Sequence, residues 1–462
     1  MENNNFGMNN GFTPEPQNGE TNNGTAFNVG AYDDFFTGDN TLDMPVNDMD
    51  NQFVNPVPPA PVKKKNKTLL AIIIGAVAVL LAIILVFVIK GCSSGNEEPY
   101  TLFNSGLARV CDSDGKYGYI NEDGEEVIKC EYDFAAQFAD NGLALVGMYD
   151  KTTDEYNNFK TEYGFINESG EYVVTPQYED AYSFGDNGLA AVKDDDKWGY
   201  IDENGEWAIE PQFDLARTFY EGFAVVAKED DDSYKYGYIN EDGEVVIDYK
   251  FDYAYGFENG LAIVEDDEEY GFINEDGEWV IDAKFDDVNS FADNGLAAAK
   301  EDDKWGFINK DGEFVISPQY DDVEDFGDNG LACVRDGEEY GFINEDGEWV
   351  IDAKFDYVNG FADNGLAAAC DDDEWGFIDE DGEFVIEPKY DGAAGFINGK
   401  ALAVKNNKYY IIDENGEETR LNGIDHISEV YEDYIVFVDD DECGIMDWEG
   451  NIIVEAKYKR IG

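Results

Sequence analysis

The sequence contains a single histidine, His426, among its 462 residues. A Ser-His-Asp or Cys-His nucleophile pair would have to use it, and histidine-based zinc catalysis usually draws on several histidines. His426 lies in the segment Ile424-Asp425-His426-Ile427, where the neighbouring apolar residues are typical of an edge strand. A structural or surface role is therefore the better interpretation, and we expect no catalytic residue and no enzymatic activity.

Basic residues are also scarce. The chain has 30 Lys and Arg against 104 Asp and Glu, and residues 91–462 alone hold 95 acids and 25 bases, a net charge of −70. Such a surface repels nucleic acid and anionic lipid, and it attracts basic partners and, non-specifically, divalent cations. An unknown protein or envelope ligand, which could be basic, is the expected partner. A hydrophobic content of 43% with 15% aromatics is still ample for a packed core, so this acidity does not indicate disorder.

The cysteines do not form a recognisable framework. They occupy unrelated positions in the repeats described below, which argues against a disulfide scaffold and against a paired-cysteine zinc site. We expect most of them to be buried as small apolar side chains. One or two disulfide bridges remain an alternative. Lipidation of Cys92 is disfavoured by Lys90 and by the long preceding tail. The six are Cys92, Cys111, Cys130, Cys333, Cys370 and Cys443.

The N-terminal part of the chain predicts a membrane anchor. Residues 1–62 lack Lys, Arg and Cys and show no helical or strand period, which is typical of a disordered tail. Four lysines (63, 64, 65 and 67) then precede Leu69 to Ile89, a stretch without charge. A helix of this length crosses a hydrocarbon core of about 30 Å, and the preceding lysines favour a cytoplasmic tail.

We therefore predict four regions: a disordered cytoplasmic tail over 1–67, a transmembrane helix over 68–90, a linker over 91–100 and an external domain over 101–462. The protein would be a single-pass protein of the cell membrane, with the bilayer as its partner along Leu69–Ile89.

A ten-residue phrase recurs through this external domain. It reads Tyr-Gly-Phe-Ile-Asn-Glu-Asp-Gly-Glu-Trp from Tyr270 and again from Tyr340. Degenerate copies lie near Tyr409 and Cys443. The second residue is Gly in nine copies and Tyr410 in the ninth, at intervals of 46, 35, 38, 34, 35, 35, 35, 34 and 34 residues. A fixed period of this size indicates a repeat array.

The phrase and its flanking Asn-Gly-Leu-Ala and Pro-Gln-Tyr-Asp segments resemble the bacterial WG-repeat family, also called KWG repeats. The resemblance extends from about Leu102 to Lys457. It implies a repeat architecture and, with the predicted anchor, a bacterial membrane protein, but no particular activity.

Residues 187–213 serve as a representative unit. We expect strands at 189–192, 198–202 and 206–209, joined by a polar turn and by a turn at Glu203-Asn204-Gly205 in which Gly205 has a positive φ. Pro211 should end regular pairing, and a fourth short segment could follow near Phe213. The fold class predicted is thus all-β, with about ten tandem three-stranded antiparallel meanders.

Apolar residues on both faces of these meanders require cover on both sides, which neighbouring repeats can supply. The recurrent glycine, for example Gly306, would let the next unit approach closely. Ten units of three strands favour an open or superhelical stack, with a propeller-like closed ring as the alternative. The worn ninth and tenth copies would then cap one end.

The abundant acids recur at equivalent repeat positions, as in Asn274-Glu275-Asp276-Gly277, whereas an active site is normally a single place. Solvated hairpin turns are therefore favoured over paired catalytic acids. Turns such as 301–303 and 371–374 have the oxygen ligands that calcium takes, but none matches an EF-hand or a glycine-rich calcium repeat. We expect no cofactor, with calcium in these turns as the alternative.

Two repeats are longer than the others. The extra residues lie around Met148–Thr161 and Glu229–Tyr234, and insertions in repeat proteins map to loops, often on a binding face. An extended hairpin is an equally good interpretation of the first.

Together these features predict a membrane-anchored, extracellular, non-enzymatic binding or scaffolding module of unknown ligand. Two alternatives remain. The first is a receptor that reports outside binding to the cytoplasmic tail, and the second is a structural cell-surface protein with calcium-stabilised acidic turns.

Overall fold

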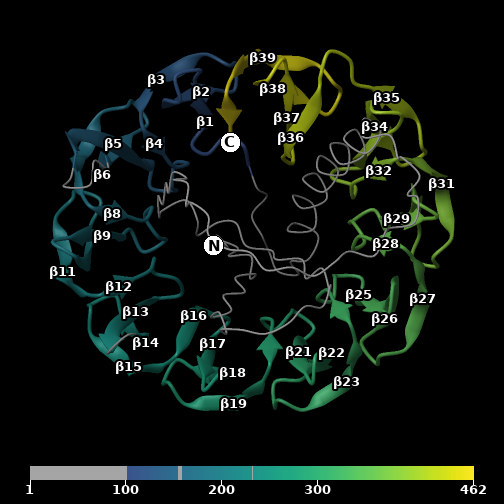
Figure 1. Ribbon diagram of the computed structural model, residues 1–462, viewed down its shortest axis with the longest axis horizontal. Coiled ribbons are helices and arrows are strands. Elements are labelled where there is room, and N and C mark those ends of the chain that lie inside the picture. The colour runs from purple at the N-terminus through teal and green to yellow at the C-terminus, as the bar shows by residue number, and fades with distance from the viewer. Residues whose placement is uncertain (1–100, 154–158, 231–232) are drawn as a thin grey trace, which may run out of the picture. The chain divides into compact units, whose positions relative to one another are not determined.

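A computed structural model describes residues 101–153, 159–230 and 233–462 of the chain. These residues form forty β-strands, and no helix occurs among them. The strands make ten four-stranded antiparallel sheets that stand as blades around a central axis (Figure 1). The prediction of an all-β repeat domain is confirmed, whereas the preferred open stack is wrong and the closed ring is correct.

We number the blades 1 to 10 in chain order. Blade 1 contains β1 (Leu107–Cys111), β2 (Tyr117–Asn121), β3 (Glu126–Tyr132) and β40 (Arg460–Ile461). Blade 2 contains β4 (Phe134–Ala135), β5 (Leu143–Thr153), β6 (Phe159–Asn167) and β7 (Tyr172–Tyr178). Blade 3 contains β8 (Asp180–Ala181), β9 (Ala190–Asp194), β10 (Lys197–Ile201) and β11 (Trp207–Phe213). Blade 4 contains β12 (Leu215–Ala216), β13 (Phe223–Asp230), β14 (Ser233–Asn240) and β15 (Val245–Phe251). Blade 5 contains β16 (Tyr253–Glu258), β17 (Leu261–Asp266), β18 (Glu269–Asn274) and β19 (Trp279–Phe285).

The second half of the ring repeats this order. Blade 6 contains β20 (Asp287–Val288), β21 (Ala297–Glu301), β22 (Lys304–Ile308) and β23 (Phe314–Tyr320). Blade 7 contains β24 (Asp322–Val323), β25 (Leu331–Asp336), β26 (Glu339–Asn344) and β27 (Trp349–Phe355). Blade 8 contains β28 (Tyr357–Val358), β29 (Ala367–Asp371), β30 (Glu374–Ile378) and β31 (Phe384–Tyr390). Blade 9 contains β32 (Gly392–Ala393), β33 (Lys400–Val404), β34 (Tyr409–Asp413) and β35 (Glu418–Arg420). Blade 10 contains β36 (His426–Val430), β37 (Tyr434–Asp439), β38 (Glu442–Asp447) and β39 (Ile452–Tyr458).

Each blade has one more strand than the sequence predicts. The three strands expected within residues 187–213 correspond to β9, β10 and β11, and the fourth segment expected near Phe213 is β12. β12 does not join that sheet, because Leu215 and Ala216 pair with Ala227 and Val226 of β13. The short strand is therefore the innermost strand of the following blade, and Figure 1 shows β4, β12 and β16 nearest the centre, with β11, β19 and β31 on the rim.

The ring closes through the last residues of the chain. Val110 and Cys111 of β1 pair with Ile461 and Arg460 of β40, so blade 1 takes its innermost strand from the end of the sequence. The prediction that the ninth and tenth copies cap an open stack is wrong, because these copies form blades 9 and 10 and both have neighbours on each side.

Aromatic side chains fill the space between the outer strands of neighbouring blades. The last residue of one outer strand meets the first residue of the next edge to face, as in Phe285–Phe314 at 5.6 Å and Tyr320–Trp349 at 5.8 Å between ring centroids. Such contacts contribute about 0.5–1.5 kcal/mol beyond the area they bury. Trp349 and Phe384 both take part in these contacts between neighbouring sheets.

The recurrent glycine is required because a strand of its own blade leaves no room for a side chain, and not because the next blade approaches it. In blade 6, Trp305 pairs with Tyr320 and Phe307 pairs with Ile316, so β23 carries extra residues opposite Gly306. This bulge brings the main chain of β23 against the glycine, where a side chain has no room. The same bulge explains why Pro211 lies inside β11, whereas the sequence predicts that it ends the strand.

The residues at the hairpin turns are of types that tolerate the positive φ angles found there. Gly205 has a φ of 78°, as predicted for the turn after β10. In the turn between β21 and β22, Asp302 and Asp303 have φ of 54° and 62°, and positive φ at both central positions defines a type I′ turn. Asp and Asn tolerate this conformation better than most other side chains. The acids at these tips therefore have a conformational reason to be there.

Carboxylates also join consecutive blades. Asp321, just before blade 7, accepts a hydrogen bond from the amide of Gly337 in that blade at 2.8 Å and forms an ion pair with Lys304 of blade 6. Equivalent Lys–Asp pairs occur at Lys197–Asp214 and Lys235–Asp252. In blade 7 the lysine is replaced by Glu339, and an acid at this place cannot form such a pair with the next blade.

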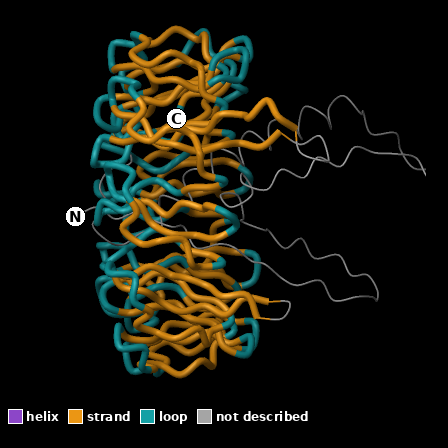
Figure 2. The backbone as a smooth tube through the Cα atoms, turned by 90° about the vertical axis from the view of Figure 1, so that its left-hand side faces the viewer, coloured by secondary structure: helices purple, strands orange, loops and turns teal. Residues whose placement is uncertain are grey.

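The two longer repeats are extended hairpins. β5 and β6 are 11 and 9 residues long, and β13 and β14 are 8 residues each, whereas most corresponding strands have five or six. Because all blades share one strand order, both hairpins extend from the same side of the ring, as Figure 2 shows. The extended-hairpin interpretation is confirmed.

Candidate binding pocket between blades 9 and 10

The repeat is most strongly altered where blade 9 meets blade 10. The outer strand β35 has only three residues, and its pairs are consecutive: Ile412 with Glu418, Ile411 with Thr419 and Tyr410 with Arg420. It therefore lacks the bulge of the other outer strands. Without the bulge no main chain crowds the second position of the phrase, which explains why Tyr410 can stand where the other copies have glycine.

The side chains of β35 differ as well. In the sequence Glu418, Thr419 and Arg420 align with Trp349, Val350 and Ile351 of blade 7. Because β35 has no bulge, Thr419 pairs with Ile411 in the way that Ile351 pairs with Phe342. Glu418 cannot continue the aromatic contacts and instead accepts hydrogen bonds from Tyr390 Oη and Lys389 Nζ, both at 3.0 Å. Although burial opposes it, the hydrogen bonds from Lys389 and Tyr390 hold the pKa of Glu418 below its usual value. A short polar strand thus leaves space on this side of blade 9.

Trp448 fills part of that space. It stands in the turn Asp447-Trp448-Glu449-Gly450, at the place of Glu345 in the turn of blade 7. Its indole nitrogen donates to the carbonyl of Tyr431 at 3.1 Å, and only 7% of the residue is exposed. The ring is part of a core cluster that also contains Leu402, Ile411 and Leu421.

Lys400 is the third departure. It begins β33 at the position where Leu331 begins β25, and its ammonium donates to the carbonyl of Trp448 at 3.0 Å and to the carboxylate of Glu449. A lysine in place of leucine therefore connects blade 9 to the turn of blade 10. The contact also leaves a positive charge at the edge of the remaining space.

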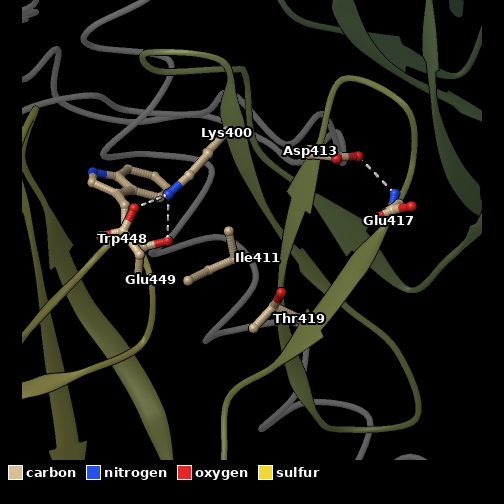
Figure 3. A pocket seen from close by; sticks show the side chains of 7 residues that line it. All are labelled: Lys400, Ile411, Asp413, Glu417, Thr419, Trp448 and Glu449. Carbon is tan, nitrogen blue, oxygen red and sulfur yellow. Dashed lines mark hydrogen bonds and ion pairs between the residues drawn. The ribbon is translucent and has the colours of Figure 1, made fainter.

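These changes leave a pocket of about 200 Å³. Figure 3 shows Lys400, Trp448 and Glu449 on one side of it, Asp413 and Glu417 on the other, and Ile411 and Thr419 between them. The Asp413 carboxylate is held in place because it accepts hydrogen bonds from the amides of Asn415 at 3.0 Å and Glu417 at 2.7 Å. The pocket thus offers an ammonium donor, several carboxylate acceptors, a hydroxyl and an apolar surface.

The sequence does not predict this pocket. Tyr410 departs from the phrase, and the last two copies are degenerate, but degenerate copies are equally typical of an end cap. Aligning the copies would have revealed Lys400 for Leu and Trp448 for Glu, although only the ring brings these residues together.

The residues considered for catalysis or metal binding lie elsewhere. His426 pairs with Val438 in blade 10, as the first residue of the inner strand β36. The acidic segments 301–303 and 371–374 lie at hairpin tips on blades 6 and 8. Within residues 101–153, 159–230 and 233–462, no group of three or more His, Cys, Asp or Glu side chains is arranged to hold a metal ion.

The five cysteines in the described part of the chain are free thiols. Cys111, Cys333, Cys370 and Cys443 are buried, as predicted, and Cys130 is half-buried. Burial raises the pKa of the Cys130 thiol to about 12 and that of Cys370 to about 11, which disfavours the reactive thiolate. Cys92 lies outside the described residues.

The predicted membrane span, Leu69–Ile89, also lies outside the described residues, as do the predicted tail and linker. Among the residues that the structure does describe, none belongs to a helix with the length and apolarity to cross a bilayer.

A family model for the WG-containing repeat matches the chain eight times, at residues 117–151, 163–198, 198–230, 236–269, 270–305, 305–339, 340–375 and 375–409. These matches cover more than half of the chain. The protein belongs to the WG-repeat family. The last match ends at 409, so β35 and Trp448 of this WG-repeat protein lie beyond the matched residues, whereas Lys400 lies within them. No curated protein matches the sequence.

Solved structures resemble this WG-repeat protein only distantly. They include a eukaryotic initiation factor, at 13% identity over 65% of this chain and 95% of the other, with a TM-score of 0.41. Apo AztD from Citrobacter koseri is similar at 11% identity over 68% and 92% of the two chains, with a TM-score of 0.28. Hsv2 from Kluyveromyces lactis is similar at 10% identity over 57% and 90%, with a TM-score of 0.23. At these values the likeness carries no argument about function.

Proposed function

We propose that this WG-repeat protein is a membrane-anchored, extracellular binding or scaffolding module without enzymatic activity. The observation that carries the proposal is the pocket between blades 9 and 10, where three departures from the repeat coincide. A structural repeat needs none of them, because most other blades carry Leu and Glu at the equivalent positions and an outer strand of seven residues.

The charge distribution also favours binding over catalysis. Acids recur around the ring and are used in turns and in contacts between blades, as Asp303 and Asp321 illustrate. Cys370 lies near acids, but burial raises the pKa of its thiol and disfavours a nucleophilic thiolate, and His426 belongs to an inner strand. A net charge of −70 over residues 91–462 favours basic or neutral partners.

The membrane anchor rests on Leu69–Ile89 and on the four lysines before it. We expect protease added to intact, wall-stripped cells to digest the repeat domain and to spare the tail. Protection of the repeat domain would contradict the proposed orientation and the extracellular location together.

Binding can be tested with the full-length protein in detergent, used to capture material from cell-envelope fractions. The control is the double variant Lys400→Leu with Trp448→Glu, which restores the residues of the other repeats. We expect the parent to retain envelope material that the double variant does not. Equal retention by both would place any binding outside this pocket, and no retention by either would contradict a binding role for envelope components.

A further inference from the structure

We propose that the pocket between blades 9 and 10 binds a single neutral sugar residue. This inference rests on the proposed binding function and names the class of ligand that the pocket fits. Three properties of the pocket support it: its charge, its hydrogen-bonding groups and its size.

The charge of the pocket disfavours an anion. Asp413, Glu417 and Glu449 carry three negative charges against one positive charge on Lys400, and the surrounding domain is strongly acidic. A phosphorylated or carboxylated ligand would therefore be repelled on approach and inside the site. Lys400 does not offer a free anion-binding charge either, because its ammonium already contacts the Glu449 carboxylate.

The net negative charge of the pocket attracts a cationic ligand, but the Lys400 ammonium opposes it at one wall. Such a ligand would have to lie within a pocket of about 200 Å³ whose wall includes the Lys400 ammonium. That ammonium has three N–H groups, and its hydrogen bonds to the Trp448 carbonyl and the Glu449 carboxylate use two of them. The third can donate to a ligand oxygen, whereas it would oppose a second ammonium.

A sugar hydroxyl matches both kinds of group. It donates one hydrogen bond and accepts others, so it can bridge between the Lys400 ammonium and a carboxylate such as Glu449 or Asp413. Thr419 adds a hydroxyl, and it pairs with Ile411 where Ile351 pairs with Phe342 in blade 7. Ile411 and Trp448, which are 4% and 7% exposed, supply a small apolar area for the C–H face of the ring. Pockets for small molecules commonly combine such an apolar lining with a few polar groups.

The size of the pocket limits the ligand to one ring. Sites for drug-sized molecules are usually about 300–1,000 Å³, and this pocket is smaller. A free monosaccharide or one residue of a glycan would fit this volume.

The test uses saturation-transfer NMR on the full-length protein in detergent, with glucose, galactose, mannose and N-acetylglucosamine as probes. Glucuronate and choline report on the anionic and cationic alternatives. We expect at least one neutral sugar to show transfer that Lys400→Leu and Thr419→Val each weaken about tenfold or more. Most other repeats carry Leu at the place of Lys400, and Val has the shape of Thr without its hydroxyl, so the blades should still fold, which the melting temperature will confirm.

Trp349→Phe serves as the matched control, since it changes a tryptophan on the rim of blade 7 and should leave the sugar signal unchanged. The inference is overturned if no neutral sugar shows transfer, if glucuronate or choline is preferred, or if Lys400→Leu and Thr419→Val bind as the parent does. If the sugar test fails while envelope material is still captured only by the parent, the binding function stands and only the ligand class is wrong.

Discussion

Gly306 of β22 lies so close to the main chain of Ile316 in β23 that a β-carbon at position 306 would overlap the Ile316 carbonyl oxygen. The same β-carbon would lie 2.8 Å from the Pro318 nitrogen. The contact arises from the bulge in the outer strand and recurs in the other blades that have it. Blade 9 lacks the bulge and carries Tyr410 at this place.

Gly306→Val should therefore destabilise the domain by about 3 kcal/mol, since the clash is with main chain that cannot move without breaking the bulge. The free energy of unfolding measured by chemical denaturation checks this. Gly395→Val is the control, because no atom lies within 4 Å of a β-carbon there and its φ is not positive. A Gly306 variant as stable as the parent would mean that the outer strand can shift away.

Closure of the ring should depend on Arg109. Its guanidinium donates to the main-chain oxygen of Gly462, through Nε at 2.8 Å, and to the carbonyl of Ala135 in blade 2 at 2.8 Å. Arg109→Met removes these charge-assisted hydrogen bonds and leaves partly buried acceptors, so we expect a loss of about 2 kcal/mol in the free energy of unfolding.

Arg420→Met provides the comparison for Arg109, since Arg420 lies on the exposed strand β35. It should change the melting temperature little. If the two variants were equally stable, the contact to Gly462 would not contribute to closure.

Glu339→Lys should stabilise the domain. Glu339 occupies in blade 7 the position that Lys304 holds in blade 6, and Asp356 corresponds to Asp321. A lysine at position 339 can pair with Asp356, and the repulsion between Glu339 and Asp356 is removed. Because the site is exposed, we expect a gain of about 0.5–1 kcal/mol, and Lys304→Glu should cause a loss of similar size. Thermal unfolding of both variants measures this, and a change of the same sign in both would contradict the equivalence of the blades.

The Lys–Asp pairs should also make stability depend on acid pH. The hydrogen bond from Lys304 lowers the pKa of Asp321, and Lys197 and Lys235 lower those of Asp214 and Asp252 in the same way. An unfolded aspartate has a pKa of about 3.9, so the pairs stabilise the folded state fully above that value. As the pH falls through it, the unfolded chain takes up protons first and the contribution is lost.

Lys304→Met isolates this effect. The melting temperature of the parent should exceed that of the variant at pH 6, and the difference should shrink as the pH falls below about 4. General relief of charge repulsion affects both proteins and cancels in the comparison. A difference that stays constant over this range of pH would show that the Lys304–Asp321 pair contributes nothing through its charge.

Salt should stabilise a domain of this charge. Like charges lie closer together in the ring than in the unfolded chain, and the screening length falls from about 30 Å at 0.01 M to about 10 Å at 0.1 M. The melting temperature of the full-length protein should rise with sodium chloride, and at matched ionic strength calcium should add little, because the turn acids are used in type I′ turns. A saturable gain at micromolar calcium would instead favour specific calcium sites, and a fall with sodium chloride would contradict the repulsion argument.

Much of the blade could be predicted from local sequence. The strands around Trp198 and Trp207, the turn at Gly205 and the burial of most cysteines follow from residue type and alternation, which act over a few residues. The glycine of the phrase was recognised as a point of close approach, but the partner was misidentified. Its neighbour is the bulge of the adjacent strand, and a bulge leaves no clear signal in the residues that form it.

The sequence by itself determined that the domain is all-β, repetitive and acidic, because period, strand patterning and turn chemistry are local properties. Only the tertiary structure decided that Leu215 and Ala216 pair with the following blade, that Ile461 returns to Val110, and that Lys400 meets the turn of Trp448. These relationships depend on the rotation between successive blades, which is set by the side chains packed between the sheets and accumulates around ten blades. A period of about 35 residues is compatible with an open stack and with a ring, and packing over the whole domain selects the ring.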